Sequence, residues 1–211
     1  SHQKAIKATQ AGLFDQEIVP LEVTLEDGSK EIHKVDEGIR FDASLEAIKG
    51  VKLLAEGGAI TAATSSQICD GASGVLIVNE KGLKALGVEP LARIHHMTVV
   101  GGDPVIMLEA PIPGTEKALK KAGMKIDDID LYEVNEAFAS VPVAWAKHLG
   151  ADPARLNVHG GAIALGHPLG ASGTKLMATL VHALKAQNKR YGLQTMCEGG
   201  GLANVTIIER L

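Results

Sequence analysis

A histidine lies between two glycine-rich turns in the stretch NVHGGAIALGHPLGASG, residues 157–173. Because the unperturbed pKa of histidine is about 6.5, His167 can act as an acid or a base at neutral pH. The neighbouring glycines would let the backbone and a substrate approach it closely, so the stretch is typical of a catalytic loop. The same residues also fit a simple connection in which the histidine is satisfied by hydrogen bonds and the glycines form tight turns.

A cysteine precedes three glycines in CEGGG, residues 197–201, between two predicted strands at 191–196 and 203–208. A thiol next to exposed backbone N–H groups, in a chain with a placed histidine, indicates thiol chemistry with donors for an oxyanion. We expect the pKa of the Cys197 thiol, ordinarily about 8.5, to be lowered by such N–H clusters or by a nearby cation. The alternative is a buried, inert cysteine.

A third segment, NEAFA at residues 135–139, follows a predicted apolar strand at 129–134. Asn135 at this position is either a functional amide or the N-cap of the helix that we expect to follow. The three segments together resemble the thiolase family, in which NEAFA, GGAIALGHPLGASG and CxGGG recur in this order near the C-terminus. The resemblance continues through DEGIR at 36–40, TAATSSQICDGA at 61–72 and GDP at 102–104, and so extends over essentially the whole chain.

The resemblance implies a layered α/β/α/β/α thiolase fold. Thiolases carry their nucleophilic cysteine in the first half of the sequence, and no residue here corresponds to it, so the chain looks like the C-terminal half. We expect a loop-domain remnant at 1–57, the end of the N-terminal thiolase domain at 58–97 and the C-terminal thiolase domain at 98–211. The other half is expected on the same or on a second polypeptide, and a homodimer or homotetramer is the usual assembly of the family.

The resemblance also implies roles for four residues. His167 would help to deprotonate the nucleophilic cysteine and donate to the enolate oxygen of the thioester, while Asn135 would hold a water at the same oxyanion site. Cys197 would protonate the departing carbanion in thiolysis, or remove the α-proton in condensation. The Gly199 N–H would join a second oxyanion hole, and Glu198 departs from the aliphatic residue that many thiolases carry.

Coenzyme A and acyl-CoA enter as substrates, and no permanently bound cofactor is expected. Arg40 and Ser66 match residues of the family near the adenine and pantetheine parts, although Arg40 could equally form a surface ion pair. Ser66 stands in TSSQ, which departs from the usual GNAS wording. Met107 and Phe138 match apolar walls near the reacting carbons, and either could equally belong to the core.

Composition fits an α/β protein rich in aliphatic residues and glycine. A formal net charge of -4 gives no basic surface for nucleic acid. No apolar run approaches the roughly 18 residues that cross a bilayer, so no membrane partner is expected. The two cysteines are 128 residues apart, so they indicate neither a disulfide framework nor a metal site. The histidines do not have the spacing of metal ligands either. A reducing compartment fits best, and family expectation makes it cytoplasmic, or mitochondrial or peroxisomal in a eukaryote.

Periodicity and turn residues predict the elements around these segments. The pattern predicts a hairpin turn at residues 26–28, a buried strand at 74–78, and a helix at 81–86 that ends at Gly87. Helices are predicted at 113–122, 136–149 and 172–186, with strands at 129–134, 156–158, 191–196 and 203–208. The last two strands are expected to form an antiparallel pair, and strands alternating with helices predict parallel βαβ crossovers.

Two other functions compete with thiolase catalysis. A 3-oxoacyl synthase of the same fold usually pairs its nucleophile with two histidines or with histidine and asparagine, so Cys197 argues against it. A non-catalytic CoA-binding or assembly module would need no nucleophile.

Overall fold

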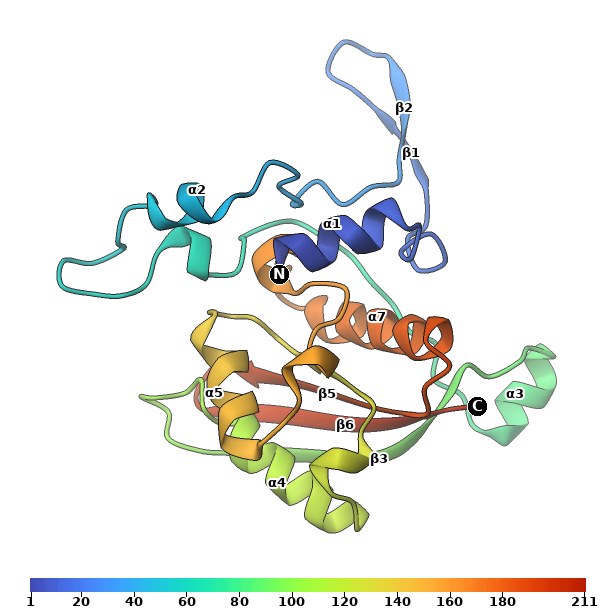
Figure 1. The fold of residues 1–211 in the computed structure, drawn as a ribbon. Helices are drawn as coiled ribbons and strands as arrows, with labels where there is room; N and C mark the ends of the chain where they lie inside the picture. The colour runs from blue at the N-terminus through green and yellow to red at the C-terminus, as the bar shows by residue number, and fades with distance from the viewer.

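One four-stranded mixed sheet, with helices on both faces, forms the centre of the structure (Figure 1). The computed structural model describes all 211 residues. The strand order is β3 (Ala92–Gly101), β6 (Leu202–Arg210), β5 (Tyr191–Glu198) and β4 (Leu131–Val134). β6 is antiparallel to both of its neighbours, whereas β4 and β5 are parallel. The mixed α/β class, the antiparallel β5–β6 pair and a parallel crossover are therefore confirmed.

Helix α7 (Ser172–Ala186) covers one face of this sheet, above β4 and β5. Leu176, Leu180 and Leu184 recur every four residues, and all three are buried, as the sequence pattern predicts. The helix lies close to β5 because residue 192 is glycine. A Cβ at Gly192 would come within 2.9 Å of the side chains of Leu180 and Leu184.

Helices α4 (Pro111–Ala122) and α5 (Ser140–Leu149) cover the other face. Trp145 of α5 is fully buried there, donates its indole N–H to Thr115 Oγ1 at 2.9 Å, and meets the Tyr132 ring edge-on. Because a buried indole N–H needs a partner, this bond ties α5 to α4 beneath the sheet.

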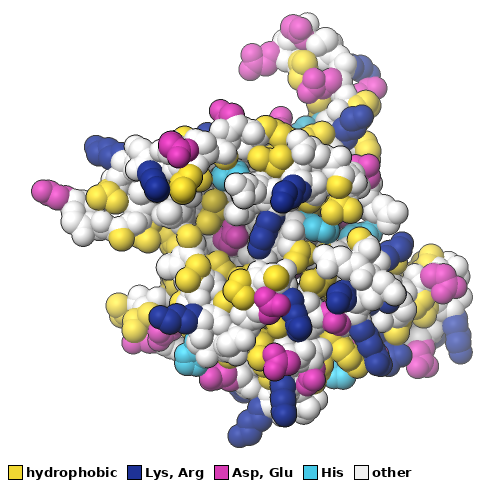
Figure 2. Space-filling view, in the orientation of Figure 1, with side chains coloured by type: hydrophobic (Ala, Val, Ile, Leu, Met, Phe, Trp, Pro, Cys, Tyr) yellow, Lys and Arg dark blue, Asp and Glu magenta, His cyan; other side chains and the backbone are white.

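A second layer of chain lies beyond α7 (Figure 1). Helix α1 (His2–Gln10) packs on the one-turn helix α6 (Ala162–Leu165), with Ala5, Ala8 and Ile39 in a small separate core. The hairpin β1–β2 (Leu21–Thr24 and Lys30–His33) projects from this layer, and Figure 2 shows acidic side chains around its tip. The predicted turn at residues 26–28 connects its two strands.

Short elements complete the chain. Their bounds are α2 Leu45–Lys49, α3 Glu80–Leu86, and the 3-10 turns η1 Ala62–Thr64, η2 Ile126–Asp128 and η3 Pro153–Arg155. Gly87 ends α3 in the left-handed conformation, as predicted. None of the helices combines the length and the apolar character needed to cross a membrane. The predicted division into three domains stays a prediction, although β3 runs without a break across its boundary at residue 98.

The predicted buried strand at residues 74–78 is wrong. These residues form no strand, and Leu76 and Ile77 are 75% and 69% exposed. An apolar run becomes a buried strand only where neighbouring strands accept its hydrogen bonds, and no segment of this chain pairs with it.

The predicted strand at 156–158 is also wrong, because only Leu156 forms a β-bridge, to Tyr132. Asn157 then turns the chain at φ 45°, and its side-chain amide takes the place of a neighbouring strand. Its Oδ1 accepts from the Val134 N–H and its Nδ2 donates to the Val134 carbonyl, both at 2.9 Å.

Candidate active site

The carboxyl ends of β4 and β5 place two of the predicted residues at one edge of the sheet. Val134 pairs with Thr195 across the parallel strands, and the Asn135 N–H continues the ladder by donating to the Thr195 carbonyl at 3.1 Å. Cys197 follows two residues later on β5. In open α/β sheets, this edge is where ligands bind.

His167 joins this edge from the loop between α6 and α7. Its Nε2 lies 3.5 Å from Asn135 Nδ2, and its Nδ1 lies 2.6 Å from Ser172 Oγ. The Ser172 hydroxyl donates its one proton to the Pro168 carbonyl at 2.9 Å, so it must accept from Nδ1–H. The neutral ring therefore carries its proton on Nδ1, and the lone pair of Nε2 faces the Asn135 amide nitrogen.

The environment keeps this imidazole neutral. Burial and the positive charge of Lys175 lower the pKa of His167 from its ordinary value. A base with a lowered pKa is unprotonated at neutral pH and can accept a proton at Nε2. Once protonated, Nε2–H becomes a donor directed at the same space.

The backbone of His167 is fixed by a segment distant in sequence. The His167 N–H donates to the Gln67 carbonyl at 3.0 Å, and the Gln67 amide donates to the carbonyls of Ile163 and Gly38, both at 2.8 Å. Gly166 has φ 78°, and a Cβ there would lie 2.3 Å from Cys69 Sγ. Only glycine therefore lets the chain enter His167 at this point.

Cys197 is half-buried, and the expectation of a lowered pKa is wrong. Burial raises the pKa of its thiol above the ordinary value, and the negative charge of Glu198 raises it further. No cation acts on it in this structure. A protonated thiol at neutral pH suits the proton donor of thiolysis. Gly199 is exposed in the turn between β5 and β6.

The N-cap alternative for Asn135 is wrong, because α5 begins four residues later than predicted and its N-cap is Ala139. Residues 135–139 instead lie along residues 64–66, where the Ser66 N–H donates to the Ala137 carbonyl and the Ala139 N–H to the Thr64 carbonyl. These backbone bonds hold the segment outside the helix, and the side chain of the buried Asn135 lies beside His167.

The four residues matched to the CoA and acyl sites fall in two groups. Ser66 donates its N–H to the carbonyl of Ala137, and its neighbour Ser65 forms a β-bridge with Phe138, which is partly buried against the main core. Arg40 is exposed and forms no ion pair, so the surface-pair alternative is wrong, and it lies two residues after Gly38, to which Gln67 is bonded. Met107 stands apart, in the loop whose Gly102 N–H donates to the Gly201 carbonyl at 2.8 Å. Its φ of 56° is unusual for a residue with a side chain.

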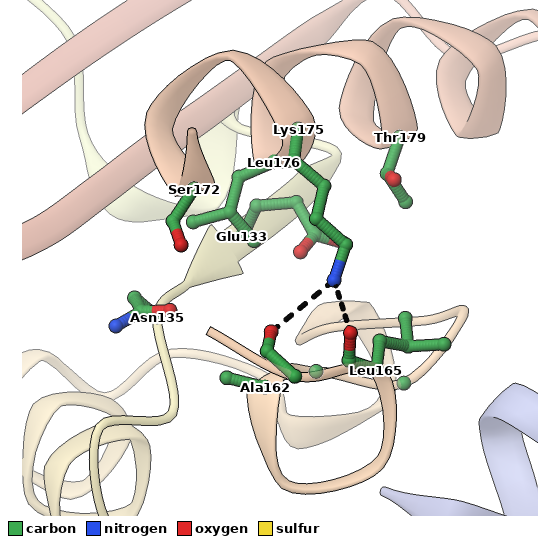
Figure 3. Close-up of a pocket in the computed structure, with 11 residues that line it drawn as sticks. Glu133, Asn135, Ala162, Leu165, Ser172, Lys175, Leu176 and Thr179 are labelled. Atoms are coloured by element: carbon green, nitrogen blue, oxygen red, sulfur yellow. Dashed lines mark hydrogen bonds between the residues drawn. The ribbon is translucent and has the colours of Figure 1, made fainter. Parts of the chain in front are cut away.

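Two buried ionisable side chains near His167 were not predicted. Figure 3 shows Glu133 of β4 and Lys175 of α7 lining a small cavity of about 10 Å³, together with Asn135 and Ser172. Glu133 is fully buried, its Oε2 has no partner, and burial followed by the charge of Glu136 raises its pKa well above the ordinary value. A carboxyl between the apolar residues Tyr132 and Val134 of β4 is the sequence signal that could have revealed it.

Comparisons with known proteins show the family of the chain. Residues 88–210 match the family described as Thiolase, C-terminal domain, and residues 1–81 match Thiolase, N-terminal domain. The whole chain is 56% identical to the steroid 3-ketoacyl-CoA thiolase FadA6 of Mycobacterium tuberculosis, over 50% of that protein. It is also 44% identical to the 3-ketoacyl-CoA thiolase of Marinobacter nauticus, over 55% of it. The chain thus spans about half the length of the curated relatives it matches.

Solved structures match over the whole chain as well. The acetyl-CoA acetyltransferase of Bacillus anthracis superposes with a TM-score of 0.92 at 36% identity, over 54% of its chain. Human mitochondrial 3-ketoacyl-CoA thiolase in complex with CoA superposes with a TM-score of 0.89 at 38% identity, over 52% of its chain. The predicted thiolase fold is confirmed, and the chain belongs to the thiolase family.

Proposed function

We propose that this chain supplies the acid–base and oxyanion half of a thiolase, which interconverts a 3-ketoacyl-CoA and CoA with acetyl-CoA and a shortened acyl-CoA. The observation that carries the proposal is the arrangement at the sheet edge. His167 presents an unprotonated Nε2 beside Asn135, at the sheet edge where Cys197 lies near the end of β5. The similarity to thiolases over the whole chain supports the same reaction.

In this proposal each residue has its own role. His167 Nε2 takes the proton of the nucleophilic thiol, which the family carries in its first half, and the thiolate then adds to the 3-keto carbon. When the bond between the α and β carbons breaks, its electrons form the enolate of acetyl-CoA, whose oxygen is stabilised by His167 Nε2–H and by a water on Asn135. The Cys197 thiol, which its raised pKa keeps protonated, gives its proton to the α-carbon, and acetyl-CoA leaves. The Cys197 thiolate then takes the proton of the incoming CoA thiol, whose sulfur attacks the acyl thioester and carries off the shortened acyl group as acyl-CoA. The freed nucleophilic thiolate regains its proton from His167.

We infer that Arg40 and Ser66 bind the CoA part and that Met107 and Phe138 flank the acyl part. The bonds of Gln67 support the first inference, because they bring the segments of Arg40 and Ser66 together. The name of the mycobacterial relative makes a steroid 3-ketoacyl-CoA one substrate to test beside acetoacetyl-CoA. The family assembly, a homodimer or homotetramer, is part of the same proposal.

The experiment joins residues 1–211 behind the N-terminal half of the mycobacterial relative and measures acetyl-CoA formation from each 3-ketoacyl-CoA and CoA. We expect turnover that falls about 10²–10³-fold in His167→Ala, as it does on loss of an oxyanion donor. Cys197→Ala should fall at least as far. His148→Ala, an exposed histidine bound to Glu116, is the matched control and should turn over normally.

Two results would contradict the proposal. Turnover that is equal in His167→Ala and His148→Ala would remove the assigned base. A folded chimera that binds CoA in equilibrium dialysis, but forms no acetyl-CoA, would favour the non-catalytic CoA-binding module instead.

A further inference from the structure

Lys175 reaches from α7 to the turn that leads into His167. It follows Ser172 by three residues, so the two side chains leave the same face of the helix. Its ammonium group donates to the carbonyl of Leu165 at 2.5 Å and to that of Gly166 at 3.2 Å. Figure 3 shows the side chain extended from α7 toward these oxygens. They are the two carbonyls that immediately precede His167.

These carbonyls need a donor. They end α6, a single helical turn, and the last carbonyls of a helix have no partner within it. A cation at this end also interacts favourably with the helix dipole. Because Gly166 turns the chain sharply, the direction in which these two carbonyls point also sets the position of the next residue.

We propose that Lys175 is a positioning residue for His167: by holding the Leu165 and Gly166 carbonyls it fixes the backbone of the loop, while Ser172, one turn earlier, fixes the imidazole ring. α7 therefore holds the histidine at two points. This inference deepens the proposed function and, in its catalytic part, rests on it.

The charges around Lys175 suit this arrangement. Burial lowers its pKa, and Asp36, Cys69, Glu133 and Glu17, each from a different segment, oppose that shift. Lys175 is in turn the charged group that lowers the pKa of His167, in addition to burial. The same ammonium group thus fixes the loop and keeps the imidazole neutral.

The test compares Lys175→Met, which keeps most of the apolar stem, with Lys175→Arg, which keeps the charge and the donors. Lys185→Met, an exposed lysine on the same helix, is the matched control. NMR titration of His167 in the 211-residue chain gives its pKa, and the chimera described above gives kcat and KM. We expect Lys175→Met to raise the pKa of His167 and to lower kcat about 10²-fold with little change in KM, since small misplacements cost that much. Lys175→Arg and Lys185→Met should stay within a few-fold of the parent.

An unchanged titration and an unchanged kcat in folded Lys175→Met overturn the proposal. If Lys175→Met does not fold, Lys175→Gln, which is neutral and keeps a donor, must show the same raised pKa. The titration needs no turnover, so the two proposals fail separately. If the parent chimera and all its Lys175 variants are inactive, but Lys175→Met shifts the pKa of His167, the proposed function is contradicted and the positioning role is not. If Lys175→Met turns over normally while His167→Ala loses turnover, the positioning role is contradicted and the proposed function is not.

Discussion

The hydrogen bond from His167 to Ser172 decides which ring nitrogen is free. In Ser172→Ala the Nδ1 proton loses its acceptor, so both tautomers become populated and the ring can rotate. We expect turnover in the chimera to fall about 10–100-fold, the cost typical of losing a side chain that orients a functional histidine. ¹⁵N NMR of the His167 ring should show the mixture directly. Ser172→Thr, which keeps the hydroxyl, and Ser140→Ala, at an exposed serine, should retain one tautomer and full rate.

The buried Glu17 carboxyl lowers the free energy of unfolding of the protein at high pH. Burial raises its pKa to about 7, while the hydrogen bond from Thr179 and the charge of Lys175 act in the opposite direction. Because the folded pKa lies above the unfolded one, its contribution is fully favourable below the unfolded pKa of about 4.5 and is lost as the pH rises through 7. Glu17→Gln should therefore be more stable than the parent at pH 8, by about 1–3 kcal/mol, and equal to it near pH 4.

Urea denaturation at both pH values measures this difference. The exposed Glu89→Gln is the control and should match the parent at each pH. A Glu17→Gln protein with the same free energy of unfolding as the parent at pH 8 would show that the Glu17 carboxyl is not buried in solution.

At the scale of elements, the contact between α7 and β5 sets the distance from the sheet edge to the His167 loop. Gly192 lies directly under Leu180 and Leu184, with no room for a Cβ. Gly192→Ala should destabilise the protein by about 1–3 kcal/mol, as overpacking of a core does, and thermal unfolding measures it. Gly74→Ala, where a Cβ would meet nothing within 4 Å, should change the midpoint little. Equal midpoints for the two variants would contradict the close packing.

The sequence predicts those elements whose partners lie nearby in the chain. Helix α7 begins and ends at the predicted residues, because its leucine spacing and its packing on β5, which follows it directly in the chain, are both local features. Residues 74–78 and 156–158 were assigned as strands from composition alone, and a strand depends on partners that composition does not reveal. α5 starts late because residues 64–66 hydrogen-bond the backbone of Ala137 and Ala139, a contact between segments about 70 residues apart.

Some residues of the site could be predicted from the sequence and others could not, for the same reason. His167, Cys197 and Asn135 stand out by residue type and flanking glycines, and the structure brings His167 and Asn135 within 3.5 Å. The residues that hold them, Gln67 and Lys175, act through backbone carbonyls of other segments, which leaves no pattern in the sequence. The direction of the Cys197 pKa was also beyond the sequence, because burial decides it and not the flanking glycines.

At the scale of the whole molecule, apolar side chains remain uncovered. Val75, Leu76, Ile77 and Val78 form one exposed run, and Ile68 lies fully exposed a few residues earlier. Contiguous apolar surface of this kind marks an interface in a stable protein. We therefore expect the 22.0 kDa chain to associate in solution, with a second copy or with the other thiolase half.

Gel filtration with light scattering over a range of concentrations measures this association. The parent should elute above the mass of one chain, and Leu76→Lys should shift it toward one chain without loss of helical signal, because a charge at the centre of the run must be removed from water for the contact to form. Lys84→Leu, an exposed substitution on α3, should leave the mass unchanged. A soluble 22.0 kDa species for the parent at every concentration would mean that this apolar run is stable in water, and the expected partner would have to be given up.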